Sequence, residues 1–143
     1  MVFESYYGAH NENVEIYKYY EKELSEISDI EKVESVSYIE YRVLNDISVV
    51  SNNPIRFYFQ IREELGYYLL TDNGDNYGGY TFSDDEKESI ETYLSGSGVG
   101  INFENDLNLV YLKLGTLDED FNISFLAKKY IDAITYINSI LED

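Results

Sequence analysis

The sequence contains no cysteine, a single proline, a single histidine and no long hydrophobic run. The absence of cysteine excludes disulfides, thiolate zinc sites and cysteine nucleophiles. Because His10 lies alone in a polar N-terminal stretch, a Ser-His or histidine-metal mechanism would depend on one surface residue. No segment approaches the roughly 18 apolar residues of a membrane span, and no signal-peptide pattern opens the chain. These absences predict a soluble intracellular protein.

Basic residues are scarce, since 10 lysines and arginines stand against 28 aspartates and glutamates, for a formal net charge of −18. Phosphate contacts need clustered lysine and arginine, so the charge argues against direct nucleic-acid binding and against an anionic membrane surface. Residues 47–71 are neutral and the flanking segments are acidic, as expected for central strands surrounded by solvated helices. The acidity fits either high solubility or attraction to a basic partner.

Three stretches have the 3.6-residue periodicity of amphipathic helices. The first covers residues 12–28. The second runs from Ser83 to Leu94 and begins with the capping-box pair of Ser83 and Glu86. The third is opened by the acids Asp118–Asp120 and carries a wide apolar stripe through "NISFLAKKYIDAITYINSIL". The sequence therefore predicts an N-terminal, a middle and a C-terminal helix.

Period-two alternation predicts the strands. It is clear in "ESVSYIEYRVL" (residues 34–44) and in "IRFYFQI" (residues 55–61). The second of these is predicted to pair antiparallel with "YYLLT" (residues 67–71) across the short "REELG" connection. "LNLVYLKL" (residues 107–114) is interpreted as a strand buried on both faces.

The length and composition suit one folded domain. The chain has 143 residues, of which 44% are hydrophobic and 16% aromatic, so it can bury a real core and is not a disordered acidic tail. The order of helices and strands predicts a single acidic α+β domain over residues 1–143, with an antiparallel sheet and helices on one side.

The stretch "TDNGDNYGGYTFSDDEKESI" (residues 71–90) concentrates acids and glycines and raises the question of a metal site. Counted from Asp72 as an EF-hand loop, the glycine position is Tyr77 and the position that requires a glutamate is Ser83. A tight turn followed by a helix cap explains the same residues, so we expect no metal and no cofactor. The alternative is a metal- or ligand-binding domain that uses the Asp72–Asp85 loop, with weak calcium or magnesium ligands at Asp72, Asp75 and Asp84.

Three segments resemble the bacterial and phage family catalogued as domain of unknown function 1828. "LLTDNG" (residues 69–74) matches its leucine-threonine-aspartate-x-glycine turn, "YLSGSGVGIN" (residues 93–102) its glycine-valine stretch, and "AKKYIDAITYINSI" (residues 127–140) its closing helix. The resemblance spans roughly the last two-thirds of the chain, although "DNYGGYTF" is longer than the family's connection. The family has no established catalytic residues, so the resemblance implies a setting, the cytoplasm of a bacterial host cell, rather than a chemistry.

No enzyme signature is present, because the chain has no phosphate loop and its paired carboxylates lie at turns and helix starts. The sixteen tyrosines supply the rigid, amphipathic contact area of protein interfaces. In the pairs Tyr6/Tyr7, Tyr19/Tyr20 and Tyr67/Tyr68 we expect one ring to point outward. We therefore predict a non-enzyme that binds other proteins.

The function predicted on these grounds is a nucleic-acid mimic that inhibits a basic, nucleic-acid-handling protein, such as a nuclease or a CRISPR effector. Carboxylates would stand where phosphates lie and tyrosines where bases lie. This describes a phage or mobile-element anti-defence protein such as an anti-CRISPR. The alternatives are an immunity protein that neutralises a nuclease toxin, and an acidic housekeeping or oligomerisation domain that forms a homodimer. The predicted partner-binding residues are Asp84, Asp85, Glu86, Glu88 and Glu91 beside Tyr77 and Tyr80, with a second patch at Asp118, Glu119 and Asp120.

Overall fold

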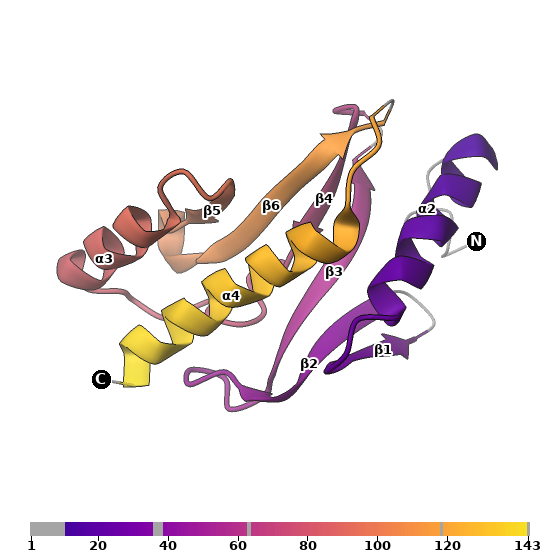
Figure 1. Cartoon of the computed structure of the whole chain (residues 1–143). Helices are drawn as coiled ribbons and strands as arrows, with labels where there is room; N and C mark the ends of the chain where they lie inside the picture. The colour runs from indigo at the N-terminus through magenta and orange to yellow at the C-terminus, as the bar shows by residue number, and fades with distance from the viewer. Residues whose placement is uncertain (1–10, 36–38, 63, 118, 143) are drawn as a thin grey trace.

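The computed structural model describes residues 11–35, 39–62, 64–117 and 119–142, which form a six-stranded antiparallel sheet and three α-helices (Figure 1). This confirms the predicted α+β class, with an N-terminal, a middle and a C-terminal helix. Along the chain the elements are α2 (Asn11–Ser25), β1 (Ile30–Glu34), β2 (Ile39–Ile47), β3 (Pro54–Arg62), β4 (Tyr67–Thr71), α3 (Asp84–Leu94), β5 (Val99–Asn102), the 3-10 turn η1 (Glu104–Asp106), β6 (Leu109–Thr116) and α4 (Ile123–Glu142).

The strands lie in the order β1-β2-β3-β4-β6-β5. The predicted hairpin is confirmed, since β3 and β4 pair antiparallel from Tyr58 opposite Thr71 to Arg62 opposite Tyr67. Two edge strands were not predicted. β1 has only two apolar residues among its charges, and β5 is four residues long and contains a glycine. Neither strand has enough apolar alternation to be recognised in the sequence.

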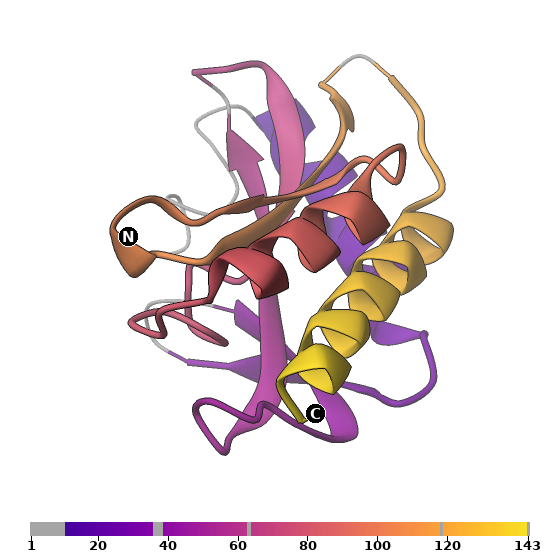
Figure 2. The same cartoon turned by 90° about the vertical axis from the view of Figure 1, so that its left-hand side faces the viewer.

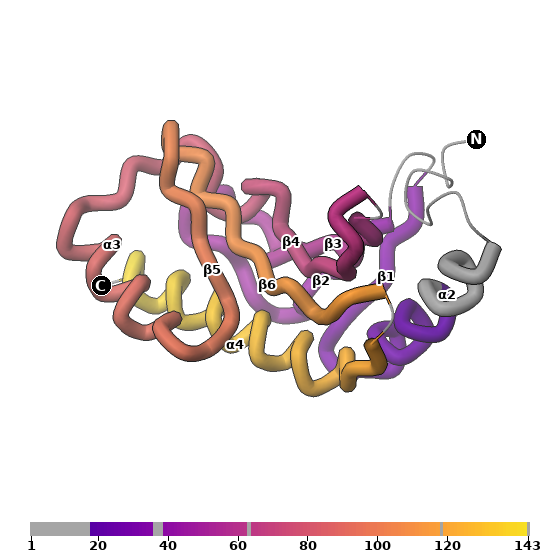
Figure 3. Tube along the Cα trace, turned by 90° about the horizontal axis from the view of Figure 1, so that it is seen from above, coloured from indigo at the N-terminus to yellow at the C-terminus, as the bar shows by residue number. Residues whose placement is uncertain are grey.

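The helices lie along one face of the sheet, where α4 crosses the strands (Figure 3). α2 contacts α4 on the side of β1, and α3 contacts α4 and β5 at the opposite edge. Figure 2 shows α3 and α4 next to each other. Because α3 and α4 pack side by side, residues far apart in the sequence can form one surface there.

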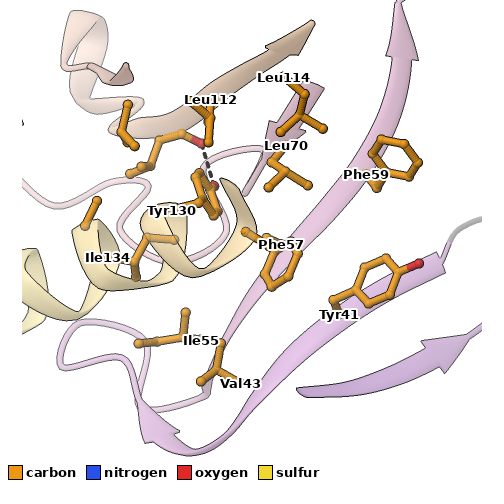
Figure 4. Close-up of a cluster of buried hydrophobic side chains, with 14 of the residues drawn as sticks. Tyr41, Val43, Ile55, Phe57, Phe59, Leu70, Leu112, Leu114, Tyr130 and Ile134 are labelled. Atoms are coloured by element: carbon orange, nitrogen blue, oxygen red, sulfur yellow. Dashed lines mark hydrogen bonds between the residues drawn. The ribbon is translucent and has the colours of Figure 1, made fainter. Parts of the chain in front are cut away.

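The core lies between α4 and the sheet (Figure 4). Phe57 of β3, Leu70 of β4 and Leu112 of β6 point towards Tyr130 of α4, and all four side chains are buried. The Tyr130 hydroxyl donates a hydrogen bond of 2.7 Å to the carbonyl oxygen of Val110. The alternation of β3 and the apolar stripe of α4 therefore meet, as their patterns predict.

The predicted burial of both faces of residues 107–114 is wrong. Val110, Leu112 and Leu114 are buried against the helices, whereas Leu107, Tyr111 and Lys113 are exposed. The three helices cover only one face of the sheet, so alternate residues of β6 point away from them.

Two predicted helix boundaries are also wrong. α2 ends at Ser25 rather than at residue 28, and Asp29 follows with a left-handed φ of 66°. α4 begins at Ile123, so Glu119 and Asp120, two of the acids predicted to open the C-terminal helix, lie before it. The Asn122 side chain accepts a hydrogen bond from the Phe125 amide, which is the role of a helix cap. The asparagine therefore starts α4, and Glu119 and Asp120 precede it.

Candidate functional site

The connection between β4 and α3 is a folded turn held by the buried Asp72. One carboxylate oxygen accepts hydrogen bonds from the amides of Gly74 (2.9 Å) and Val110 (3.0 Å), and the other accepts one from the Asn76 side chain (3.3 Å). A Cβ on Gly78 would lie 2.4 Å from the Gly74 carbonyl oxygen, so the turn has no room for a side chain there. The acids and glycines of this stretch are therefore used to fold it.

The three aspartates of the metal-binding alternative do not share a site. Asp72 is buried among amide donors, and Asp75 accepts a hydrogen bond from the Tyr58 hydroxyl. Asp84 is exposed at the start of α3. In the part of the chain that the structure describes, no three histidine, aspartate or glutamate side chains converge in a way that could hold a metal ion.

Tyr77 was predicted to be an exposed partner-binding residue, and this is wrong. Its side chain is fully buried, and its hydroxyl donates a hydrogen bond of 3.1 Å to the carbonyl oxygen of Ile134 in α4. Tyr80 is half-buried and meets the ring of Phe82 edge-on, with 4.9 Å between the ring centroids. The turn folds back over the core, so Tyr77 packs inward beneath it.

The acids of α3 divide into a cap and an exposed surface. The predicted capping box is confirmed, because the Ser83 hydroxyl accepts from the Glu86 amide and the Glu86 carboxylate accepts from the Ser83 amide. Glu86 is therefore engaged within its own helix. Four of the predicted partner-binding acids are exposed: Asp84, Asp85, Glu88 and Glu91.

A concave surface between α3 and α4 collects two of these acids and two tyrosines. We call it the α3–α4 hollow; its volume is about 560 Å³ and it is lined by Asp85, Glu88, Ser89, Thr92, Tyr93 and Tyr136. The rings of Tyr93 and Tyr136 stack face to face at 3.7 Å, and Tyr93 remains 45% exposed. Among the described residues, no lysine or arginine lines this hollow.

The sequence analysis missed both of these tyrosines. Asp85, Ser89 and Tyr93 are spaced by four residues, so helical geometry places them along one face of α3 and could have identified Tyr93 from the predicted Asp85. Tyr136 lies on another helix, and nothing local to it indicates its neighbour. The stack exists because α3 and α4 pack together.

A second hollow lies where α2 meets the chain before α4, and we call it the α2 hollow. Its volume is about 460 Å³, and it is lined by Tyr19, Tyr20, Glu23, Asp120, Phe121, Asn122 and Ile123. Tyr19 is 58% exposed and Tyr20 is buried, as predicted for this pair. No described lysine or arginine lines this hollow either.

The second predicted acidic patch comprises Asp118, Glu119 and Asp120, and only one of its described residues lines a hollow. Asp120 lines the α2 hollow, whereas Glu119 is exposed and accepts a hydrogen bond of 2.8 Å from the Thr116 hydroxyl. Asp118 lies outside the described residues.

The central strands hold an ion-pair network that the sequence analysis missed. Glu40 of β2 is fully buried, accepts a hydrogen bond from Arg42 and lies 3.6 Å from the Arg56 guanidinium. Burial is the main cause that raises the pKa of the neighbouring Tyr58 hydroxyl far above its usual range. Arg62 pairs with Glu64 at 2.9 Å. The arginines of the neutral central region are thus matched by glutamates rather than gathered into a basic surface.

Comparisons with protein-family models, curated proteins and solved structures find no significant match to this chain. The resemblance to the domain of unknown function 1828 family therefore has no support from them. Within the described residues, every helix is too short or too polar to cross a membrane.

Proposed function

We propose that this protein is a non-catalytic, acidic inhibitor that binds a basic, nucleic-acid-handling protein in the cytoplasm of a bacterial cell. One observation carries the proposal: each of the two hollows combines two carboxylates with an exposed tyrosine ring. A basic surface that normally binds a nucleic acid would find negative charge and aromatic faces at both places.

The distance between the hollows suits an extended basic surface. Ile123 lines the α2 hollow and Tyr136 lines the α3–α4 hollow, thirteen residues further along the same helix. At 1.5 Å per residue, the two positions lie about 20 Å apart along α4. A partner that contacts both hollows would therefore have to span about 20 Å along α4.

The distribution of charge supports the same proposal. The net charge is −18, and the arginines of β2 and β3 are paired with glutamates. Contact with phosphates would require free, clustered bases, so a nucleic acid itself is a poor ligand. A positively charged protein is a good one, because long-range attraction raises its rate of association.

The proposal is tested by capturing partners from a lysate of the natural host with the wild type and with the double variant Asp85→Lys/Glu88→Lys. A matched control, Glu26→Lys/Glu31→Lys, changes the net charge equally on exposed residues near β1, at the sheet edge opposite α3. We expect the first variant to lose the partner and the control to retain it. Capture by the wild type should weaken between about 0.05 M and about 0.5 M salt, where the Debye length falls well below ~10 Å.

The captured protein identifies the biological role. A CRISPR or restriction protein indicates an anti-defence role, and a nuclease toxin indicates an immunity role. In both cases the wild type should inhibit the partner's binding or cleavage of nucleic acid. Equal capture by the wild type and the folded Asp85→Lys/Glu88→Lys variant at both salt concentrations would contradict the proposal, because the acidity would then serve solubility alone.

A further inference from the structure

The stacked tyrosines of the α3–α4 hollow present an aromatic surface that the core does not use. Tyr93 and Tyr136 lie almost parallel, with an interplanar angle of 6°, and Tyr93 is 45% exposed. Other stacked pairs, such as Tyr41 with Phe57 and Phe59 with Tyr68, lie in the core, where both rings are buried. The face of an exposed tyrosine ring carries negative potential and attracts cations.

The lining of the same hollow also contains hydrogen-bond acceptors. Asp85 and Glu88 are exposed in its lining, and Ser89 and Thr92 add hydroxyl groups. The lysine of α3, Lys87, lies over the ring of Phe103 at 5.5 Å and is not part of the lining. No cation among the described residues therefore competes for these carboxylates within the hollow.

Two features of the hollow favour a guanidinium over an ammonium group. A planar guanidinium can stack on a tyrosine ring while its forked N–H groups donate to carboxylates, whereas an ammonium is a compact and strongly hydrated point charge. The volume of about 560 Å³ lies in the range of small-ligand sites and accommodates an arginine side chain.

We infer that the α3–α4 hollow is a receptor for an arginine side chain of the basic partner, with the guanidinium stacked on the Tyr93/Tyr136 pair and bonded to Asp85 and Glu88. This inference rests on the proposed function for its partner, but it concerns a chemistry that can be measured without that partner.

Neither of the other two hollows lined by described residues has this combination. A third hollow, between the α2–β1 connection and α4, contains Asp29, Asp46 and Asp132 but also Lys128, and no aromatic ring lines it. In the α2 hollow, Tyr20 is buried and stacked on Phe121 at 4.2 Å. Only the α3–α4 hollow, of the three, joins a stacked tyrosine pair to carboxylates without a competing base.

The test is an NMR titration of the full chain with three short glycine-based peptides that contain two arginines, two lysines or two citrullines. Citrulline keeps the planar shape of arginine and removes its charge. We expect amide shifts centred on Ser89, Tyr93 and Tyr136, arginine binding about two- to fivefold tighter than lysine binding, and no measurable citrulline binding.

Three variants separate the ring from the charge. Tyr93→Leu keeps an apolar contact with Tyr136 and should abolish the preference for arginine, while Tyr93→Phe should retain it. Asp85→Asn/Glu88→Gln should weaken both the arginine and the lysine peptides, and the matched control Glu26→Gln/Glu31→Gln should not. Because Tyr93 is 45% exposed and Asp85 and Glu88 are exposed, we expect these substitutions to preserve the fold, which the same spectra report.

Equal affinity for arginine and lysine, a preference that survives Tyr93→Leu, or shifts centred elsewhere would each overturn the arginine site. The proposed function fails separately, when partner capture does not depend on Asp85 and Glu88. An arginine-specific hollow with unchanged capture would remove the inhibitor proposal and keep the site. If the Asp85→Lys/Glu88→Lys variant loses capture but the hollow shows no preference for arginine, the inhibitor proposal stands and the arginine site is removed.

Discussion

Five asparagines and two aspartates of the described residues have a conformational role that the composition does not reveal. The non-glycine residues with positive φ in the described ranges are all of these two types: Asp29, Asn45, Asn52, Asn73, Asn105, Asp106 and Asn108. Aspartate and asparagine tolerate the left-handed region better than other side chains. Only Asp29 and Asp106 of this list are acids, so backbone conformation accounts for two of the 28 acids and the net charge needs another explanation.

Asp72 should make the stability of the protein fall as pH rises from about 4 to about 6. Burial raises the pKa of this carboxyl to about 6 in the folded state, from 3.8. Between these values the folded state holds a proton that the unfolded state has released, so raising the pH favours unfolding. A pKa difference of this size lowers the free energy of unfolding by about 3 kcal/mol in all. Above pH 6 Asp72 is ionised in both states and causes no further change.

Urea unfolding at a series of pH values measures this effect. Asp72→Asn cannot titrate, so its free energy of unfolding should change less between pH 4 and pH 6 than that of the wild type. Glu26→Gln, an exposed acid, serves as the control and should follow the wild type. Identical pH profiles for Asp72→Asn and the wild type would show that other carboxyls cause the dependence.

At the scale of elements, the C-terminal half of α4 is tied to the β2–β3 connection by one buried side chain. The Asn138 side chain accepts a hydrogen bond from the Val49 amide (2.9 Å) and donates one to the Ile47 carbonyl oxygen (2.6 Å). The neighbouring Ser48 hydroxyl donates to the Asn76 carbonyl oxygen (2.8 Å), so the β4–α3 turn joins the same network. Polar contacts between distant segments thus position the end of α4 that carries Tyr136.

Asn138→Ala should lower the free energy of unfolding by about 2 kcal/mol, because it leaves two partly buried backbone groups without their partner. Urea unfolding measures the loss, and hydrogen exchange should show faster exchange of the Val49 amide. Ser139→Ala changes the next, exposed residue of the same helix and is the matched control. A change within a few tenths of a kcal/mol, with the Val49 amide still protected, would mean that α4 is held by its apolar stripe alone.

At the scale of the whole molecule, the acids lie mainly on the helices and connections, while the bases of the central strands are paired. Asp85 and Glu88 of α3 line a hollow that no described lysine or arginine lines, whereas Glu21 of α2 pairs with Lys32 of β1, and Glu40 pairs with Arg42 and Arg56. With a net charge of −18, repulsion among the unpaired acids opposes the compact state.

Added sodium chloride should therefore stabilise the folded protein while it weakens binding to a basic partner. Between about 0.02 M and about 0.5 M salt, we expect the free energy of unfolding to rise by on the order of 1 kcal/mol, because the repulsions are screened and each exposed pair is worth only a few tenths. Thermal unfolding at the two concentrations measures the change.

The variant Glu26→Lys/Glu31→Lys removes repulsion and should show a smaller rise. A free energy of unfolding that falls with salt would indicate that ion pairs such as Arg62–Glu64 outweigh the repulsion.

The sequence by itself determined the elements whose signals are local. Strict alternation over residues 55–61 identifies β3, and the Ser83–Glu86 pair identifies the start of α3, because each depends on neighbours within a few residues. The high negative charge is likewise a property of composition. The sequence did not identify β1 and β5, because these segments have weak local signals and become strands by pairing with β2 and β6.

Tertiary structure alone decided which side chains reach the surface. Tyr77 and Tyr93 each follow an acid by two residues in the sequence, yet Tyr77 is buried beneath its turn and Tyr93 is 45% exposed against Tyr136. Glu40 lies in an alternating strand and is buried among arginines from two strands. The physical reason is that burial depends on what packs over a residue from distant parts of the chain, and local patterns carry no information about that partner.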